Sequence, residues 1–330
     1  MSQPGPFVEQ TAPLQDLTAL VRPEMDRINR ELAQDLAPGE ADLRPLLDHV
    51  AKYRGKQLRS ALVMLVAKAV GGVSEAHFTV AKVVELIHTA TLVHDDILDH
   101  AALRRQLATV NSLHGSEIAV LLGDYIYARA FNLSLALSDH TCSRVLSDVT
   151  QVICQGEITQ LVHRFDFTWD EDRYLRVIAD KTASLFAAAT RLGAHYAHAA
   201  PNVCDALERY GLELGIAFQI VDDCLDLRGD EEIVGKSLGT DLDAGKLTLP
   251  LLYLLGLRDD AEPRLRDVMK SPRRQQRLAA EFDLAAALEF SEQRARQRAE
   301  SAIVALQVLP ASLARDALAE LAQFVVRREQ

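Results

Sequence analysis

The stretch Ser74–Asp99, SEAHFTVAKVVELIHTATLVHDDILD, decides the fold class. Its apolar residues recur at spacings of three and four, as at Val80, Val83 and Ile87. This period places them on one face of a helix, whereas a half-buried strand would alternate apolar and polar residues. We therefore predict one long helix from Ser74 to about Ala102, with a group of aspartates near its end.

The rest of the chain has the same helical character. No proline occurs between Pro45 and Pro201, and proline breaks helix interiors. Glycine and proline pairs such as Gly71-Gly72 mark the helix ends, and strand alternation is hard to find. An all-α fold follows, in two domains or in one large helical domain. Besides the long helix, we predict helices over about residues 17–36, 55–70, 116–137, 140–163, 171–199, 203–227, 247–257, 284–308 and 311–328.

The composition narrows the class of protein. Apolar residues make up 48% of the 330 and the formal net charge is −11, which argues against a nucleic-acid partner. The four cysteines form no C-x-x-C pair, so we expect free thiols in a reducing compartment. The first 13 residues are polar, lack a secretory pattern and are expected to be flexible, and the longest apolar stretch near the start is too short for a bilayer. We predict a soluble, cytoplasmic protein.

Three aspartates, Asp95, Asp96 and Asp99, lie near the end of the predicted long helix. Asp95 and Asp99 are one turn apart on one face, where like charges repel unless a cation joins them. Hard carboxylate oxygens without His or Cys favour Mg²⁺, which is usually completed by water and by substrate phosphates. Alone, this triplet is equally compatible with a solvated acidic face.

A second triplet with the same spacing follows the apolar stretch from Gly215 to Val221. Half-buried aspartates without partners are costly, so two such triplets favour a binding site over two solvated faces. Two facing acidic helices would hold two or three Mg²⁺ ions around one diphosphate. The predicted metal ligands are Asp95, Asp96, Asp99, Asp222, Asp223 and Asp226.

The basic residues match this interpretation. Singly, each is more often a surface charge, but together they would complement two diphosphates, one held through Mg²⁺ and one held directly. His88 lies seven residues before Asp95 and so on the same helix face; a histidine there is as often structural as functional. The cations are Lys56, Arg59, Arg104, Arg105, Lys181, Lys236 and Lys246.

Further motifs accompany these residues in a fixed order. They are Gly55-Lys56-x-x-Arg59, the run from Glu85 to Asp99, Arg104-Arg105, Gly123-Asp124-Tyr125, Gly156-Glu157-x-x-Gln160, Lys181-Thr182, Phe218-Gln219, Gly235-Lys236 and Gly245-Lys246-x-Thr248-x-Pro250. From about Gly55 to the C-terminus the chain resembles the trans-isoprenyl (polyprenyl) diphosphate synthases, most closely the long-chain, octaprenyl-type members. The resemblance implies one all-α domain over residues 1–330, with antiparallel helices around a deep central cavity, and usually a homodimer.

The resemblance also implies the reaction, a head-to-tail (1′-4) condensation of isopentenyl diphosphate with an allylic prenyl diphosphate. The allylic C–O bond ionises with Mg²⁺, and an apolar cavity keeps water from the carbocation. Asp95, Asp99, Lys181 and Asp222 would be catalytic. Isopentenyl diphosphate would be held by Lys56, Arg59, His88 and Arg105. The allylic diphosphate would be held by Arg104, Lys181, Thr182, Gln219, Lys236 and Lys246.

The chain departs from the family pattern at four positions. Gln57 stands where the family usually has Arg, which would weaken binding of isopentenyl diphosphate. Ser60 and Ala108 stand where it usually has Pro. Gln106 stands where Gly is usual after the arginine pair, which would change the loop that follows the first motif.

Residues one turn before the first motif bear on product length. In short-chain members a bulky aromatic side chain blocks the growing tail there, whereas this chain has the small residues Ala90 and Thr91. We expect the cavity floor to lie deeper, at Phe131 or Leu135, and the product to exceed twenty carbons.

Four alternatives remain at this point. One is a short-chain farnesyl or geranylgeranyl diphosphate synthase, and another is a non-catalytic subunit of a heteromeric synthase, which Gln57 and Gln106 keep open. A class I terpene cyclase would typically replace the second aspartate motif. A helical scaffold would leave both motifs unexplained. A peripheral membrane contact for product release is also left open.

Overall fold

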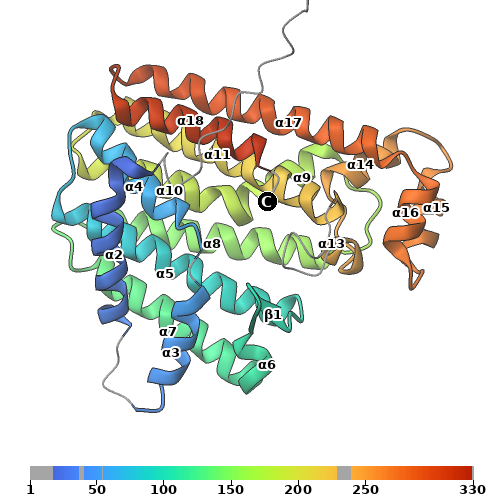
Figure 1. Cartoon of the computed structure of the whole chain (residues 1–330), viewed down its shortest axis with the longest axis horizontal. Helices are drawn as coiled ribbons and strands as arrows, with labels where there is room; N and C mark the ends of the chain where they lie inside the picture. Colours follow the sequence, from blue (N-terminus) through green and yellow to red (C-terminus); the bar gives the residue numbers. More distant parts are fainter. Residues whose placement is uncertain (1–17, 37–40, 54, 229–238, 329–330) are drawn as a thin grey trace, which may run out of the picture.

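The structure, a computed structural model, describes residues 18–36, 41–53, 55–228 and 239–328. The expectations for residues 1–13 and for Lys236 lie outside these ranges. Apart from one two-stranded hairpin, the regular elements of the described residues are helices, which confirms the predicted all-α fold (Figure 1). None of the described helices is long and apolar enough to cross a membrane.

Sixteen α-helices occur in the described residues. They are α2 (Arg22–Asp35), α3 (Arg44–Val50), α4 (Leu58–Val70), α5 (Glu75–Leu98), α6 (Val110–His114), α7 (Ser116–Ser134), α8 (Thr141–Val162), α9 (Glu171–Ile178), α10 (Ser184–Tyr196), α11 (Pro201–Arg228), α13 (Thr240–Asp243), α14 (Leu249–Gly256), α15 (Ala261–Met269), α16 (Arg274–Glu281), α17 (Leu284–Ala305) and α18 (Leu313–Arg327).

The remaining elements are short. Strands β1 (Leu103–Arg104) and β2 (Leu107–Ala108) pair antiparallel. Three 3₁₀ turns, η1 (Ala19–Val21), η2 (Ala51–Tyr53) and η4 (Leu306–Val308), extend neighbouring helices. A π-helical turn, η3 (Ala179–Ala183), separates α9 from α10.

The long predicted helices are present, with ends that shift by a few residues. The helix predicted over residues 171–199 is one continuous path, but η3 divides it. The hairpin and the helices α3, α6, α13, α15 and α16 were not predicted. These elements have two to nine residues, which is too short to display a hydrophobic period.

The long helices lie side by side (Figure 1). Helix α11 packs against α10 and α17, while α5 packs against α7. Helix α4 is buried on all sides from Ser60 to Ala67, which explains why its sequence is apolar all round. Ser74 begins α5, as predicted, and its N–H donates to His77 Nδ1 at 2.9 Å.

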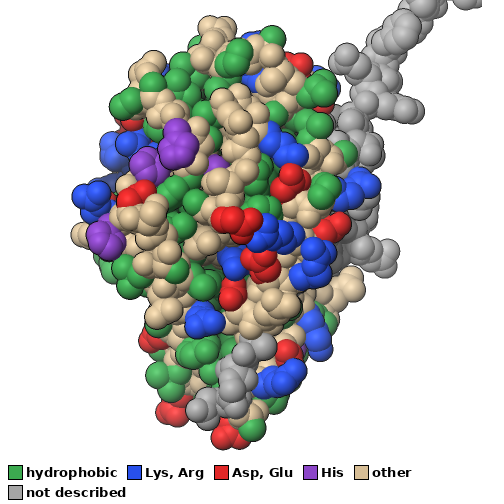
Figure 2. All heavy atoms as spheres, turned by 90° about the vertical axis from the view of Figure 1, so that its left-hand side faces the viewer, with side chains coloured by type: hydrophobic (Ala, Val, Ile, Leu, Met, Phe, Trp, Pro, Cys, Tyr) green, Lys and Arg blue, Asp and Glu red, His purple; other side chains and the backbone are tan. Residues whose placement is uncertain are grey.

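The N-terminal helix is held to the bundle partly by charge. Lys82 Nζ on α5 contacts Glu31 Oε2 at 3.0 Å and Asp35 Oδ2 at 2.8 Å on α2. On the end of the molecule shown in Figure 2, acidic and basic side chains are interleaved rather than gathered by sign. Such pairs fix the position of α2 against α5 and leave the bundle interior to the apolar core and the site.

Candidate active site

One cavity of about 830 Å³ collects nearly all the predicted site residues. Its wall comes from α4, α5, α8, η3, α11 and α18, so segments far apart in sequence meet there. The two aspartate motifs face it from α5 and α11. The predicted residues that line it are Lys56, Arg59, His88, Thr91, Asp95, Asp99, Arg104, Arg105, Lys181, Thr182, Gln219, Asp222, Asp223, Asp226 and Lys246.

The first motif presents two of its three carboxylates to the cavity. Burial raises the pKa of Asp95 to about 6, and Lys181 opposes that shift. Asp99 Oδ1 lies 3.2 Å from Lys246 Nζ. Asp96 does not line the cavity, because the next residue of a helix points about 100° away. Its side chain is buried and accepts a hydrogen bond from Arg104 Nε at 2.8 Å, so it fixes a predicted diphosphate ligand rather than facing a metal.

The second motif is held by hydrogen bonds. Asp223 accepts from Tyr174 Oη at 2.7 Å and from Gln219 Nε2 at 2.8 Å, and burial raises its pKa to about 8. Asp226 accepts from Thr240 Oγ1 at 3.0 Å and from the Asp241 N–H at 3.1 Å. Burial and, to a lesser extent, the nearby Asp241 raise the pKa of Asp226 to about 6. Burial therefore disfavours the charged form of both carboxylates.

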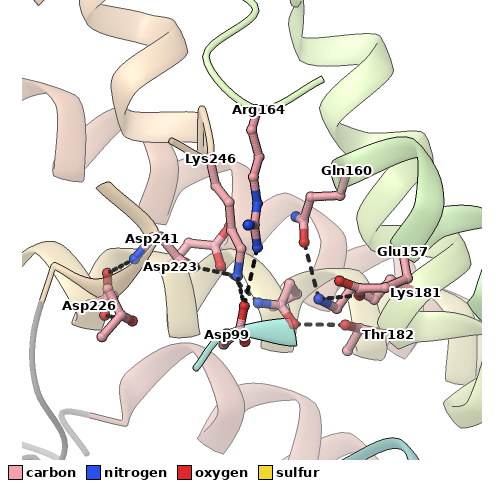
Figure 3. A network of polar contacts seen from close by, with 12 residues as sticks. Asp99, Glu157, Gln160, Arg164, Lys181, Thr182, Asp223, Asp226, Asp241 and Lys246 are labelled. Carbon is pink, nitrogen blue, oxygen red and sulfur yellow. Dashed lines mark hydrogen bonds and ion pairs between the residues drawn. The ribbon is translucent and has the colours of Figure 1, made fainter. Parts of the chain in front are cut away.

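The π turn η3 presents two consecutive residues to the cavity. Lys181 Nζ donates to Gln160 Oε1 at 3.1 Å and pairs with Glu157, while Thr182 Oγ1 donates to Gln219 Oε1 at 2.8 Å. These contacts are drawn in Figure 3. A π turn widens the helix, and such turns are frequent at functional sites.

Two glycines allow neighbouring helices to approach this turn. A Cβ at Gly156 on α8 would lie 2.9 Å from the backbone nitrogen of Lys181, and a Cβ at Gly215 on α11 would lie 2.5 Å from Ala183 Cα. Both distances are below any normal contact, so α8 and α11 pack directly on the π turn. The π turn is therefore held from two sides by backbone.

The cavity wall also carries a second basic group, on α4 and neighbouring segments. The Arg59 guanidinium stacks 4.2 Å from the centre of the Phe186 ring, and burial lowers its pKa to about 10. Burial also lowers the pKa of Lys56. The pKa of His88 is lowered well below its usual value by burial and by the neighbouring arginines, so this imidazole is neutral. The guanidinium of Arg105 lies where a side chain at Gly55 would be.

The positions that depart from the family pattern have local consequences. Gln57 begins α4 in a left-handed conformation, with φ of 47°. Ser60 Oγ donates to Glu85 Oε2 at 2.9 Å, so the serine contacts an acidic residue of the cavity wall. Arg105 and Gln106, the two turn residues of the hairpin, have φ of 52° and 64°. Gln106 thus occupies a conformation that favours glycine.

The chain-length residues are only partly where we predicted them. Thr91 lines the cavity, but Ala90 is fully buried in the main core instead. Phe131 packs against that core and does not line the cavity. The prediction for Leu135 as a floor residue is wrong, because it is 60% exposed beyond the end of α7. On α7 the aromatic residue that lines the wall is Tyr127, one helical turn before Phe131.

Several residues in the wall, and Arg164 near the first motif, were not predicted as site residues from the sequence. Arg328, at the end of α18, donates to Asp222 Oδ1 at 2.7 Å. Asp241 pairs with Lys246 at 3.1 Å. Arg164, beyond α8, lies 3.6 Å from Asp99. Glu85, Arg328 and Asp241 line the cavity. In the sequence, Glu85 and Asp241 could have been indicated only by their place in or near the recognised motifs, and Arg328 only by the basic run at the C-terminus.

The chemistry of the donors, carboxylate oxygens without imidazole or thiol, is that of a magnesium site, but the described donors do not converge. Among residues 18–36, 41–53, 55–228 and 239–328, no three acidic, imidazole or thiol groups converge closely enough to hold a metal ion. The aspartates pair with cations instead: Asp99 with Lys246, and Asp222 with Arg328. Buried oxygen ligands with raised pKa values, compensated by positive charge, match the needs of a hard divalent cation.

The chain is similar to known polyprenyl synthetases over most of its length. The polyprenyl synthetase family model matches residues 40–284. The octaprenyl diphosphate synthase of Escherichia coli (strain K12) is 37% identical over 321 residues, covering 93% of this chain and 99% of that protein. The all-trans-nonaprenyl-diphosphate synthase (geranyl-diphosphate specific) of Rhodobacter capsulatus is 33% identical, covering 96% and 98%.

A solved structure has the same fold over nearly the whole chain. It is a polyprenyl synthase from Caulobacter crescentus CB15, complexed with calcium and isoprenyl diphosphate. The TM-score is 0.90 at 35% identity, and the match covers 98% of this chain and 100% of that one.

Proposed function

Because this chain belongs to the polyprenyl synthetase family, we propose that it is a long-chain polyprenyl diphosphate synthase. It is a prenyltransferase that condenses isopentenyl diphosphate head to tail with an allylic prenyl diphosphate, to give a product beyond twenty carbons. The observation that carries this conclusion is the pair of aspartate motifs facing one cavity from α5 and α11, with basic residues in the same cavity wall.

We propose that Asp95, Asp99, Asp222 and Asp226 hold two or three Mg²⁺ ions. When bound, Mg²⁺ neutralises charge on the diphosphate and makes it a better leaving group. Asp96 and Asp223 are buried, being 1% and 4% exposed, and accept hydrogen bonds from Arg104 and Gln219, so we assign them to fixing those two side chains. That assignment narrows the metal set predicted from the sequence from six carboxylates to four.

The basic residues divide between two diphosphates. Lys181, Thr182, Gln219 and Lys246 lie around the aspartates, which supports their assignment to the allylic diphosphate. Arg104, beside Asp96, and Lys236 are assigned to the same diphosphate, the latter from its motif alone.

We assign the second basic group to isopentenyl diphosphate; it consists of Lys56, Arg59, His88 and Arg105. The neutral His88 can donate one hydrogen bond there without adding charge. Burial lowers the pKa values of Lys56, Arg59 and Arg105, and a bound anion would relieve their desolvation. This is the behaviour expected of a preorganised anion site.

The rest of the wall protects the reaction. Leu92, Leu161 and Phe218 give the cavity an apolar lining next to the aspartates. Positively charged carbon must be kept from water, and these side chains exclude it from the allylic end. The allylic C–O bond breaks and diphosphate leaves with the bonding electrons. The isopentenyl double bond then attacks the allylic carbon to form a C–C bond, and the proton lost passes to the released diphosphate.

We also propose a homodimer formed by the outer faces of α7 and α8. Leu121, Ile158 and Val162 there are 65%, 60% and 73% exposed, which is unusual for large apolar side chains on one surface. A second copy covering them would also close the cavity wall at Ile158. A single domain over the chain and a cytoplasmic location, with all four cysteines free, complete the proposal.

The decisive experiment is incubation of the purified chain with Mg²⁺, isopentenyl diphosphate and allylic primers of several lengths, followed by chromatography of the products. We expect products longer than twenty carbons from this chain alone. Only fifteen- or twenty-carbon products would identify a short-chain synthase. No product, with normal folding, would indicate a subunit that needs a partner. Asp99→Asn, folded but inactive, is the matched control.

A further inference from the structure

Arg164 lies just beyond the end of α8, and its guanidinium points at the first aspartate motif (Figure 3). Nη2 is 3.6 Å from Asp99 Oδ1, which is an ion pair but too long for a hydrogen bond. Arg164 Nε and Nη2 are shielded from solvent and have no hydrogen-bond acceptor among the described residues. A buried donor without an acceptor costs free energy, and an acceptor on a bound ligand would remove that cost.

Lys246 reaches the same carboxylate oxygen from another segment. Its Nζ lies 3.2 Å from Asp99 Oδ1 and 3.1 Å from Asp241 Oδ1. Lys246 is already satisfied by two carboxylates, whereas among the described residues the guanidinium of Arg164 has one ion pair, the longer contact with Asp99. In Figure 3 the side chains of Arg164 and Lys246 both point toward Asp99 from the same side. The two cations therefore flank one point above the first motif.

A direct contact fixes the two segments to each other. The Phe165 N–H donates to the Gly245 carbonyl at 2.8 Å. The Phe165 ring covers Gly245 so closely that a Cβ there would lie 2.4 Å from it. Phe165 and Gly245 have φ of 61° and 75°, so both turns adopt the left-handed conformation. Arg164 and Lys246, their chain neighbours, are thus placed together by a rigid contact.

We propose that Arg164 is a further ligand of the allylic diphosphate, acting beside Lys246. The inference rests on the proposed function, because it assumes that a diphosphate lies over Asp99. A guanidinium can bind phosphate oxygens through two parallel hydrogen bonds, for which its unused donors are suited. Lys246 supplies a point charge at the same place, and Arg164 adds orientation.

The competing possibility is that Arg164 merely neutralises Asp99 when no metal is bound. The two roles predict opposite results for Arg164→Gln. If Arg164 only competes for Asp99, its loss should tighten Mg²⁺ binding and leave diphosphate binding unchanged. If it binds diphosphate, its loss should weaken binding of inorganic pyrophosphate measured in saturating Mg²⁺.

The test is calorimetric titration of the full chain with inorganic pyrophosphate in Mg²⁺, together with the KM for each substrate. We expect Arg164→Gln to weaken pyrophosphate binding about tenfold, the value of a charge-assisted hydrogen bond. The KM for the allylic substrate should rise, and that for isopentenyl diphosphate should not. Arg164→Lys should recover part of the affinity. Arg144→Gln, an exposed change on α8, is the matched control.

Unchanged pyrophosphate affinity in a folded Arg164→Gln protein would overturn the inference, as would an equal rise in both KM values. If the wild-type chain itself bound no pyrophosphate in Mg²⁺, the proposed function would fail instead. The melting temperature of each variant separates these results from misfolding.

Discussion

Arg328 Nη2 donates to Asp222 Oδ1 at 2.7 Å, which joins the end of α18 to the second aspartate motif. The same nitrogen donates to the Phe218 carbonyl at 2.7 Å. The guanidinium also stacks 3.8 Å from the centre of the Phe218 ring, and only 8% of the side chain is exposed. The last turn of the described chain is thus part of the cavity wall.

Replacing Arg328 should separate its effect on folding from its effect on metal binding. Arg328→Ala removes buried charge-assisted hydrogen bonds, so we expect the free energy of unfolding of the metal-free protein to fall by about 2 kcal/mol. Asp222 loses its counter-ion, so Mg²⁺ should bind several-fold more tightly in the absence of diphosphate. Denaturant unfolding and calorimetry measure the two effects.

The control is Arg327→Ala, because Arg327 is the neighbouring arginine, and its hydrogen bond to Gln323 Oε1, at 3.4 Å, lies on an exposed surface. It should change neither quantity appreciably. If the two variants behaved alike, the contact between Arg328 and Asp222 would have no energetic importance.

The contact between Arg328 and Asp222 could not be predicted from the sequence, although other parts of the site could. The helix through Asp95 could be predicted, because a period of three and four over some twenty residues is typical of a helix and of little else. That Asp95 and Asp222 face each other could be inferred only from their matching spacing. The partner of Asp222 could not be inferred at all, because nothing in the sequence Arg327-Arg328 distinguishes a cavity cation from a surface cation.

Side-chain direction was the other limit. Ala90 and Thr91 are neighbours on α5, yet only Thr91 faces the cavity. The same holds for Asp95 and Asp96. Because neighbouring helix residues differ by about 100°, a predicted helix locates a site only to within one turn until its packing partner is known.

The close packing at η3 makes Gly215 a sensitive position. Gly215→Ala would place Cβ 2.5 Å from Ala183 Cα and 2.7 Å from Ala183 Cβ, so backbone must move. We expect a loss of roughly 1–3 kcal/mol in the free energy of unfolding, typical of overpacking. Lys181 and Thr182 would be displaced with the turn, so kcat should fall more than stability alone explains.

Gly256→Ala is the matched change, since a Cβ there meets nothing within 4 Å and the residue ends α14. It should be neutral or slightly stabilising. Thermal unfolding and steady-state kinetics of the two proteins decide the matter. Wild-type kinetics in Gly215→Ala would show that the π turn tolerates displacement.

The hairpin turn at Gln106 stores conformational strain. Its φ of 64° is left-handed, a region that glycine enters without the steric cost paid by other residues. Gln106→Gly should therefore raise the free energy of unfolding by about 1 kcal/mol. Gln106→Ala keeps the steric conflict and serves as the control. Equal melting temperatures for Gly and Ala at this position would show that the turn carries no such strain.

The aspartates make stability depend on pH in a definite direction. Asp95 and Asp226 titrate near 6 in the folded protein, against 3.8 for an unperturbed aspartate, because burial disfavours their charge. Between these values the folded state binds more protons than the unfolded state. The free energy of unfolding of the metal-free protein should therefore fall as the pH rises from about 4 to 6.

Two measurements check this. The melting temperature of Asp95→Asn should depend less on pH over this window than that of the wild type. Mg²⁺ binds deprotonated carboxylates, so it should raise the wild-type melting temperature more at neutral pH than at acid pH. The same pH slope in both metal-free proteins would show that Asp95 is not held in the state described.

Product length should respond to Thr91 and not to the outer residues of α7. Thr91 lines the cavity one turn before Asp95, and its Oγ1 donates to the His88 carbonyl at 2.8 Å, which fixes its direction. Thr91→Phe would add an aromatic ring to the wall where the growing tail leaves the aspartates. We therefore expect shorter products from the same primer, measured by chromatography.

Two comparisons identify the physical cause. Ala90→Phe enlarges a fully buried core residue, so it should lower the melting temperature more than it changes the product. Tyr127→Ala removes the aromatic side chain that lines the wall on α7, so it should lengthen the product. Leu135→Ala, at a 60% exposed position, should do neither. If Leu135→Ala lengthened the product while Tyr127→Ala did not, the tail would follow another path, along the outer face of α7.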